Sequence, residues 1–127
     1  MDEKGMKEIV DKYIRAYNDF DVEEMIKHIH DDVEFKNIAQ GQVNLRIQGK
    51  ENLKTQAEKA VDLFKKREMK IIQQKIEGNQ LENKIDFTGV LAMDIPDGPK
   101  AGETIKIEGK SIFKFEDDKI ILIEDIN

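Results

Sequence analysis

The chain has 127 residues, with 21 lysines and arginines against 27 aspartates and glutamates, giving a formal net charge of −6 at pH 7. This length suits one domain over residues 1–127, and the acidic balance argues against nucleic acid or an anionic membrane surface as a partner, because both require a basic face. The chain has no cysteine, which excludes disulfides, thiolate catalysis and cysteine-based zinc sites, and its apolar runs are too short for a transmembrane helix, so we expect a cytoplasmic protein.

The N-terminal part of the sequence predicts helices. Apolar residues recur at spacings of three and four over residues 3–18, which predicts an amphipathic helix with Tyr13 on its buried face. Asp21 and Glu24 form a capping-box pattern, so a short second helix is expected to begin there and to run to about Ile29.

The segment after these helices carries weaker signals. Residues 33–37 alternate between apolar and polar, which indicates a short strand, and residues 38–48 are expected to be irregular. A third helix is expected over residues 50–67. Its last turn would hold the cationic run Lys65-Lys66-Arg67, because positive charge is favourable at a helix C-terminus.

The remainder of the chain predicts strands. Strands are expected over residues 69–76, 81–94, 104–116 and 119–126, with a tight turn at Gly78-Asn79-Gln80. Helices that precede a run of strands predict an α+β fold, with the helices on one side of an antiparallel sheet.

Alternation within these strands predicts which side chains face inward. In the strand over residues 104–116, the apolar face carries Ile105, Ile107, Ser111, Phe113 and Phe115, and the opposite face carries Lys106, Lys110 and Lys114. In the strand over residues 81–94, one face carries Ile85, Phe87, Gly89, Leu91 and Met93. In the last strand, Ile121, Ile123 and Asp125 share a face.

The order of elements and several short motifs resemble the SnoaL-like polyketide cyclase family of the nuclear transport factor 2-like superfamily. The motifs that carry the resemblance are Tyr13–Asp21, Asp31–Phe35, Gly49–Leu53, Phe87-Thr88-Gly89, Pro99, Gly102, Gly109, Ile112–Phe115 and Asp118-Lys119-Ile120. The resemblance implies a cystatin-like cone, in which three N-terminal helices pack inside a strongly curved antiparallel sheet around an apolar pocket. The third helix is expected to lie along the concave face of the sheet.

The same resemblance implies roles for Asp125 and Tyr13. In SnoaL-like cyclases and limonene-epoxide hydrolases, an aspartate of the last strand projects into the pocket as a general acid or base, and Asp125 resembles it. Tyr13 resembles the helical tyrosine that donates a hydrogen bond to the oxyanion in ketosteroid isomerases. The alternatives are a solvated acid near the C-terminus for Asp125 and a simple core aromatic for Tyr13.

Several positions depart from the patterns of these families. Asn37 stands where ketosteroid isomerases carry their base, and Phe35 stands where limonene-epoxide hydrolases carry a tyrosine. Ser111 replaces a buried aspartate, and Leu91 replaces a histidine that many SnoaL-like sequences have. The arginine–aspartate pair of the epoxide hydrolases is also missing from the middle strand, so epoxide hydrolysis by that route is not expected.

Two functions from different classes fit these residues. The first is a cofactor-independent cyclase or isomerase, with Asp125 as general acid or base and Tyr13 as hydrogen-bond donor. The second is a non-catalytic module of the same fold that binds a small molecule or dimerises. Two or more titratable groups converging on the pocket would favour catalysis. The first function predicts a small apolar, carbonyl-bearing ligand. The residues expected to contact a ligand in the pocket are Asn37, Ser111, Tyr17, Phe35, Phe87, Leu91, Met93, Ile107, Phe113 and Ile123.

Cofactor and metal sites have little support in the sequence. It contains no glycine-rich nucleotide loop, so no cofactor is expected. His28 and His30 would diverge at a helix end, so no metal site is expected either. We expect a homodimer formed through the outer face of the sheet, where opposite charges can pair across a two-fold axis.

Overall fold

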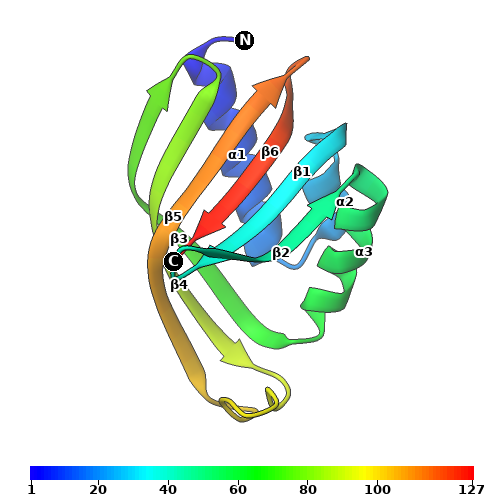
Figure 1. Ribbon diagram of the computed structural model, residues 1–127, viewed down its shortest axis with the longest axis vertical. Coiled ribbons are helices and arrows are strands. Elements are labelled where there is room, and N and C mark those ends of the chain that lie inside the picture. The colour runs from blue at the N-terminus through cyan, green and yellow to red at the C-terminus, as the bar shows by residue number, and fades with distance from the viewer.

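A curved six-stranded sheet packs around the N-terminal helix in the computed structural model, which describes residues 1–127 (Figure 1). The strand order is β2-β1-β6-β5-β4-β3. The strands are β1 (Ile29–Ala39), β2 (Gln42–Gln48), β3 (Phe64–Glu77), β4 (Gln80–Leu91), β5 (Thr104–Glu116) and β6 (Lys119–Ile126). This architecture confirms the predicted α+β class. The sheet was expected to be antiparallel throughout, and that detail is wrong. β6 returns between β5 and β1 and pairs with β1 in parallel.

The first helix, α1 (Glu3–Asn18), has the predicted bounds. The Asp2 side chain caps it by accepting a hydrogen bond from the Gly5 backbone, and its buried face includes Met6, Val10 and Tyr13. The capping prediction at Asp21 is also confirmed, since its side chain accepts a hydrogen bond from the Glu24 backbone at the start of α2 (Val22–Ile26). α2 ends at Ile26, before the expected Ile29, because Ile29 already pairs in the sheet.

The third helix, α3 (Lys50–Val61), is shorter than predicted, and the run Lys65-Lys66-Arg67 belongs to β3. The helical apolar stripe continues through Leu63 and Phe64, which explains the longer prediction. α3 packs against β1, β2 and α2, whereas α1 is the helix that lies across the concave face (Figure 1). No helix is long and apolar enough to cross a bilayer.

Residues 38–48 were expected to be irregular, and that expectation is wrong. β1 extends to Ala39, the chain turns at Gln40-Gly41 with φ angles of 53° and 79°, and β2 returns along β1. Two successive positive φ angles are typical of a type I′ hairpin turn. β2 is an edge strand in which only Leu45 and Ile47 are partly buried, so its polar composition concealed the alternation.

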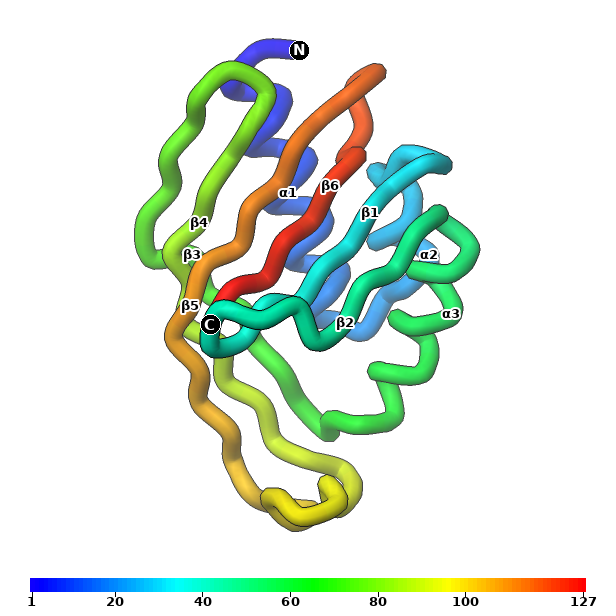
Figure 2. The backbone as a smooth tube through the Cα atoms, viewed as in Figure 1, coloured from blue at the N-terminus to red at the C-terminus, as the bar shows by residue number.

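The predicted register of β5 is confirmed at its C-terminal half, where Phe113 and Phe115 are buried and Lys110 is exposed. Its other end departs from the prediction, since Ile107 is 36% exposed. Met93 is likewise 47% exposed, because β4 ends at Leu91 before reaching it. The tube in Figure 2 shows the cause: the arm formed by β4 and β5 extends beyond the helices, which leaves its inner face uncovered.

The C-terminal end of α1 is fastened to β3. The Asn18 side chain accepts a hydrogen bond from the Met69 backbone N–H at 2.8 Å and donates one to the Met69 carbonyl oxygen at 3.3 Å. At the preceding residue, the Tyr17 carbonyl oxygen accepts a hydrogen bond from Arg67 Nε at 2.8 Å. Because β3 is an edge strand, Asn18 satisfies backbone groups that would otherwise be free on that edge.

Replacing Asn18 should therefore loosen α1 from the sheet. We expect Asn18→Ala to lower the free energy of unfolding by about 2 kcal/mol, because it removes two partly buried hydrogen bonds and leaves the Met69 backbone unpaired. Urea denaturation followed by circular dichroism measures this change. Asn44→Ala, at an exposed position of β2, is the matched control and should change stability little; equal effects of the two substitutions would contradict the role given to Asn18.

Candidate functional site

A cavity of about 170 Å³ opens between the helices and the concave face of the sheet. Most of its lining residues are apolar. The residues with polar groups come from both the helices and the sheet: Tyr13 and Tyr17 from α1, Gln56 from α3, Arg67 from β3, Ser111 from β5 and Asp125 from β6. A second cavity of about 210 Å³ adjoins it and shares several walls, among them Tyr17 and Asp125. The two form one hollow with Asp125 at their junction.

Asp125 is held by the pairing of the last two strands. It is directly opposite Ser111 in the β5–β6 register, and Ser111 Oγ donates a hydrogen bond to Asp125 Oδ1 at 2.9 Å. Burial raises the pKa of Asp125 to about 6, and the hydrogen bond from Ser111 opposes that rise only in part. A carboxyl group with a pKa near neutrality can both accept and return a proton under physiological conditions.

A glycine in β5 allows β6 to lie where it does. A Cβ atom at Gly109 would clash with the Ile126 carbonyl oxygen, which belongs to the residue after Asp125. A larger side chain there would push the end of β6 outward, and the carboxylate with it.

The two tyrosines of α1 remain protonated donors at neutral pH. Burial, reinforced by the negative charge of Asp125, raises the pKa of Tyr13 far above its usual range. Burial also raises the pKa of Tyr17 to about 12, although the nearby Arg67 charge opposes this. Tyr13 is fixed by an edge-to-face contact with Phe113, with the ring centroids 5.7 Å apart. Both phenols line the same cavity as Asp125.

Arg67 is a site residue that the sequence reasoning missed. It is only 6% exposed, and its guanidinium carbon lies 3.7 Å from the Tyr17 ring centroid and 4.6 Å from that of Phe20. Burial lowers the pKa of its guanidinium group. The charged run around Arg67 was expected at the C-terminus of a helix, where positive charge is favourable. The signal that could have located it is the alternation of Arg67 and Met69 with Lys66 and Glu68, which is typical of a strand.

The other predicted ligand contacts are distributed over three environments. Tyr17, Phe35, Ser111 and Phe113 line the first cavity, and Asn37, Phe87 and Ile107 line the adjoining one. The remaining three predicted contacts lie outside both linings: Leu91 and Ile123 are buried in the packed interior, and Met93 is exposed beyond the end of β4.

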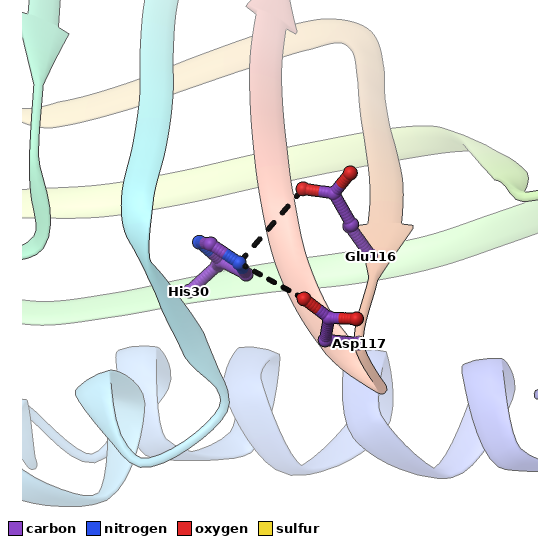
Figure 3. A group of neighbouring side chains, drawn as sticks. All are labelled: His30, Glu116 and Asp117. Carbon is purple, nitrogen blue, oxygen red and sulfur yellow. Dashed lines mark ion pairs between the residues drawn. The ribbon is translucent and has the colours of Figure 1, made fainter.

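The two histidines are at a different place in the fold. Because α2 is short, His28 lies in the turn after it and His30 lies in β1, not at a helix end. His28 faces Glu24, while His30 Nε2 lies 3.8 Å from Glu116 and 3.5 Å from Asp117 (Figure 3).

The group formed by His30, Glu116 and Asp117 could in principle hold a cation, since its ligand atoms lie within 4.8 Å of one another. However, His30 Nδ1 accepts a hydrogen bond from the Asp32 backbone N–H at 3.0 Å. In a neutral ring the proton is then on Nε2, so the atom that faces the carboxylates is a donor and has no free lone pair for a metal. The arrangement fits a hydrogen-bonded ion cluster better than a metal site.

Comparison with known proteins supports the fold. No protein of curated function matches the sequence. Among solved structures, a candidate polyketide cyclase from Xanthomonas campestris pv. campestris is similar, with a TM-score of 0.83, 20% identity and coverage of 98% of this chain and 90% of that one. TsrD from Streptomyces laurentii gives a TM-score of 0.81 and 17% identity over 98% and 89% of the two chains. An LEH-like epoxide hydrolase from M. tuberculosis gives a TM-score of 0.75 and 18% identity, with coverage of 94% of this chain and 79% of that one.

At these identities the structural likeness shows the fold alone. The family is shown by the sequence itself, because residues 10–123 match the family model of the SnoaL-like domain. That range contains α1 from Val10 onward, the whole of α2 and α3, and the sheet up to Ile123 of β6. The chain therefore belongs to the SnoaL-like domain family.

Proposed function

We propose that this protein is a cofactor-independent acid–base catalyst that moves a proton on a small, largely apolar carbonyl compound, in the manner of an isomerase or a cyclase. The observation that carries this proposal is the convergence of Asp125, Ser111 and Tyr13 on one apolar cavity. Groups with shifted pKa values in a cavity are typical of sites that transfer protons.

Each group has a distinct part in such a reaction. The Asp125 carboxylate removes a proton from the carbon next to the carbonyl group, and the electron pair of that C–H bond moves onto the carbonyl oxygen as an enolate. The Tyr13 hydroxyl donates a hydrogen bond to this oxygen. Ser111 holds the carboxylate in place. In an isomerisation, Asp125 returns this proton to the far carbon of a double bond conjugated with the enolate. In a cyclisation, the enolate carbon attacks a second carbonyl carbon of the same molecule, and the proton held by Asp125 passes to the oxygen of that carbonyl group.

The alternative is a non-catalytic module that binds a small molecule. Binding an apolar ligand requires only a cavity of the right shape, and it gives no reason to bury a carboxylate against apolar walls, where its charge costs stability. Two titratable groups of the proton-transfer kind, Asp125 and Tyr13, line this cavity together. Their convergence favours catalysis over binding alone.

The size of the hollow limits the ligand. An apolar cavity of about 150 Å³ can hold one benzene ring, so the first cavity, at about 170 Å³, accommodates a single ring. The adjoining cavity offers room for a second ring or a short chain beside Asp125. The substrate expected here is therefore a carbonyl compound with one or two rings.

Proton transfer can be tested by hydrogen–deuterium exchange on a two-ring ketone. We expect the wild-type protein to accelerate exchange of the C1 protons of 2-tetralone in D2O, measured by ¹H NMR, and Asp125→Asn to lose the acceleration by about 100-fold or more. Asp86→Asn is the matched control, because Asp86 is exposed on β4, and it should keep full activity. Wild-type exchange no faster than in buffer, or an active Asp125→Asn variant, would show that Asp125 is not the base.

The position of Asp125, partly buried against the apolar walls of the cavity, also predicts a pH-dependent change in stability. Its pKa is about 6 in the folded state, against about 3.9 in an unfolded chain. Below about pH 4 the carboxyl group is protonated in both the folded and the unfolded state, so it does not change the free energy of unfolding. Between about pH 4 and 6 the unfolded chain releases its proton first, and the free energy of unfolding falls. The full loss is reached above about pH 6.

Asp125→Asn should therefore be more stable than the wild type at about pH 8, by up to about 3 kcal/mol. The gap should close as the pH falls to about 4. Urea denaturation across this pH range measures it, with Asp86→Asn again as control. A variant that is less stable than the wild type at pH 8 would place Asp125 in a polar, charge-stabilising environment and so contradict the burial described above.

A further inference from the structure

We propose that the ligand of this cavity is an organic acid, whose carboxylate binds the guanidinium group of Arg67. This deepens the proposed function, on which it rests, by naming the chemical class of the substrate: a cyclic oxo acid in place of a neutral ketone. The proposal rests on three features of Arg67, namely its burial, its missing counter-ion and its unused hydrogen-bond donor.

Arg67 is a buried cation without an ion-pair partner. It lies 6% exposed in the cavity wall, and no carboxylate of the protein lies within 4.0 Å of it, whereas Arg46, the exposed arginine of β2, pairs with Glu34. Buried charges in proteins are usually paired, because an isolated charge loses its hydration without compensation. The rings of Tyr17 and Phe20 offset part of this cost through cation–π contacts, but they bring no negative charge.

Arg67 also retains an unused donor. Its Nε–H donates to the Tyr17 carbonyl oxygen, which accounts for the side chain as a cap for the end of α1. Its Nη2 atom is buried and has no hydrogen-bond partner. Capping α1 therefore uses the Nε–H donor of the guanidinium group and leaves the Nη2 donor without a partner. Leaving a buried charged donor without its hydrogen bond is costly.

A carboxylate satisfies both requirements at once. A neutral carbonyl oxygen would accept the hydrogen bond but leave the positive charge unbalanced. A carboxylate would accept the hydrogen bond and supply the counter-charge, and its two oxygens match the planar fork of a guanidinium group.

The position of Arg67 relative to Asp125 fits this ligand. The charges of Arg67 and Asp125 both act on the phenols of Tyr13 and Tyr17, so both tyrosines lie within electrostatic reach of both charged groups. Arg67 comes from β3 and Asp125 from β6, and both line the first cavity. A ligand bound through its carboxylate at Arg67 would lay its ring along the tyrosines and present its reacting carbon to Asp125.

A matched pair of ligands tests the proposal. Benzoate and methyl benzoate share a ring and a carbonyl group, but only benzoate carries a charge. We expect titrations followed by ¹H–¹⁵N NMR at pH 7.5 to give an affinity for benzoate at least about tenfold higher than for the ester. Benzoate should also shift the Arg67 Nε–H resonance, which reports on the native protein without any substitution.

Substitution then assigns the preference to Arg67. Arg67→Met should bind the two ligands equally, with its affinity for methyl benzoate close to that of the wild type, whereas Arg46→Met, the matched control on β2, should keep the full preference for benzoate. An equal or higher affinity of the wild type for the ester, or a preference that survives in Arg67→Met, would overturn the proposal. Ester binding without a preference for benzoate would leave the proposed function standing, whereas binding of neither compound would count against both.

Discussion

The attachment of α1 to β3 positions the remainder of the site. Asn18 and Arg67 each make hydrogen bonds between the two elements. Together they fix the last turn of α1, which carries Tyr17 and follows the turn that carries Tyr13. The sheet supplies Ser111 and Asp125 through the pairing of β5 with β6. The cavity exists where these two assemblies face each other, so its shape depends on a few hydrogen bonds made at the edge of the sheet.

The site opposes the general preference for an apolar interior. One hollow contains a carboxyl group, a guanidinium group and two phenols, and burial disfavours the charged form of each of them. The surrounding core of α1 and the central strands is a cluster of buried apolar side chains, and its burial offsets this local cost. Sites that sacrifice stability for chemistry are a common feature of enzymes.

The sequence predicts the parts of the fold in which periodicity is regular. α1 and strands β5 and β6 were predicted with their bounds, because their apolar residues repeat without interruption. The end of α3 and the strand β2 could not be predicted, because tertiary pairing decided them: Phe64 fits a helical stripe as well as a strand. Extending the helix past Phe64 also misplaced Arg67, although the alternation around it is typical of a strand. At the site, the alternation of residues along β6 predicted that the Asp125 side chain points toward the interior. Its contact with Ser111 depends on the register between strands, which alternation within one strand does not specify.

The parallel pairing of β1 with β6 has a consequence for the order of folding. β6 lies between β1 and β5, as Figure 2 shows, so the hairpin of β1 and β2 joins the rest of the sheet only through residues 119–126. These residues are far along the chain from β1, and contacts between distant segments form slowly because a long loop must close first. During synthesis, the hairpin must wait for β6 while the meander of β3, β4 and β5 can already assemble. The strand that closes the sheet is also the strand that carries Asp125, so the cavity acquires its acid in the same step that completes the fold.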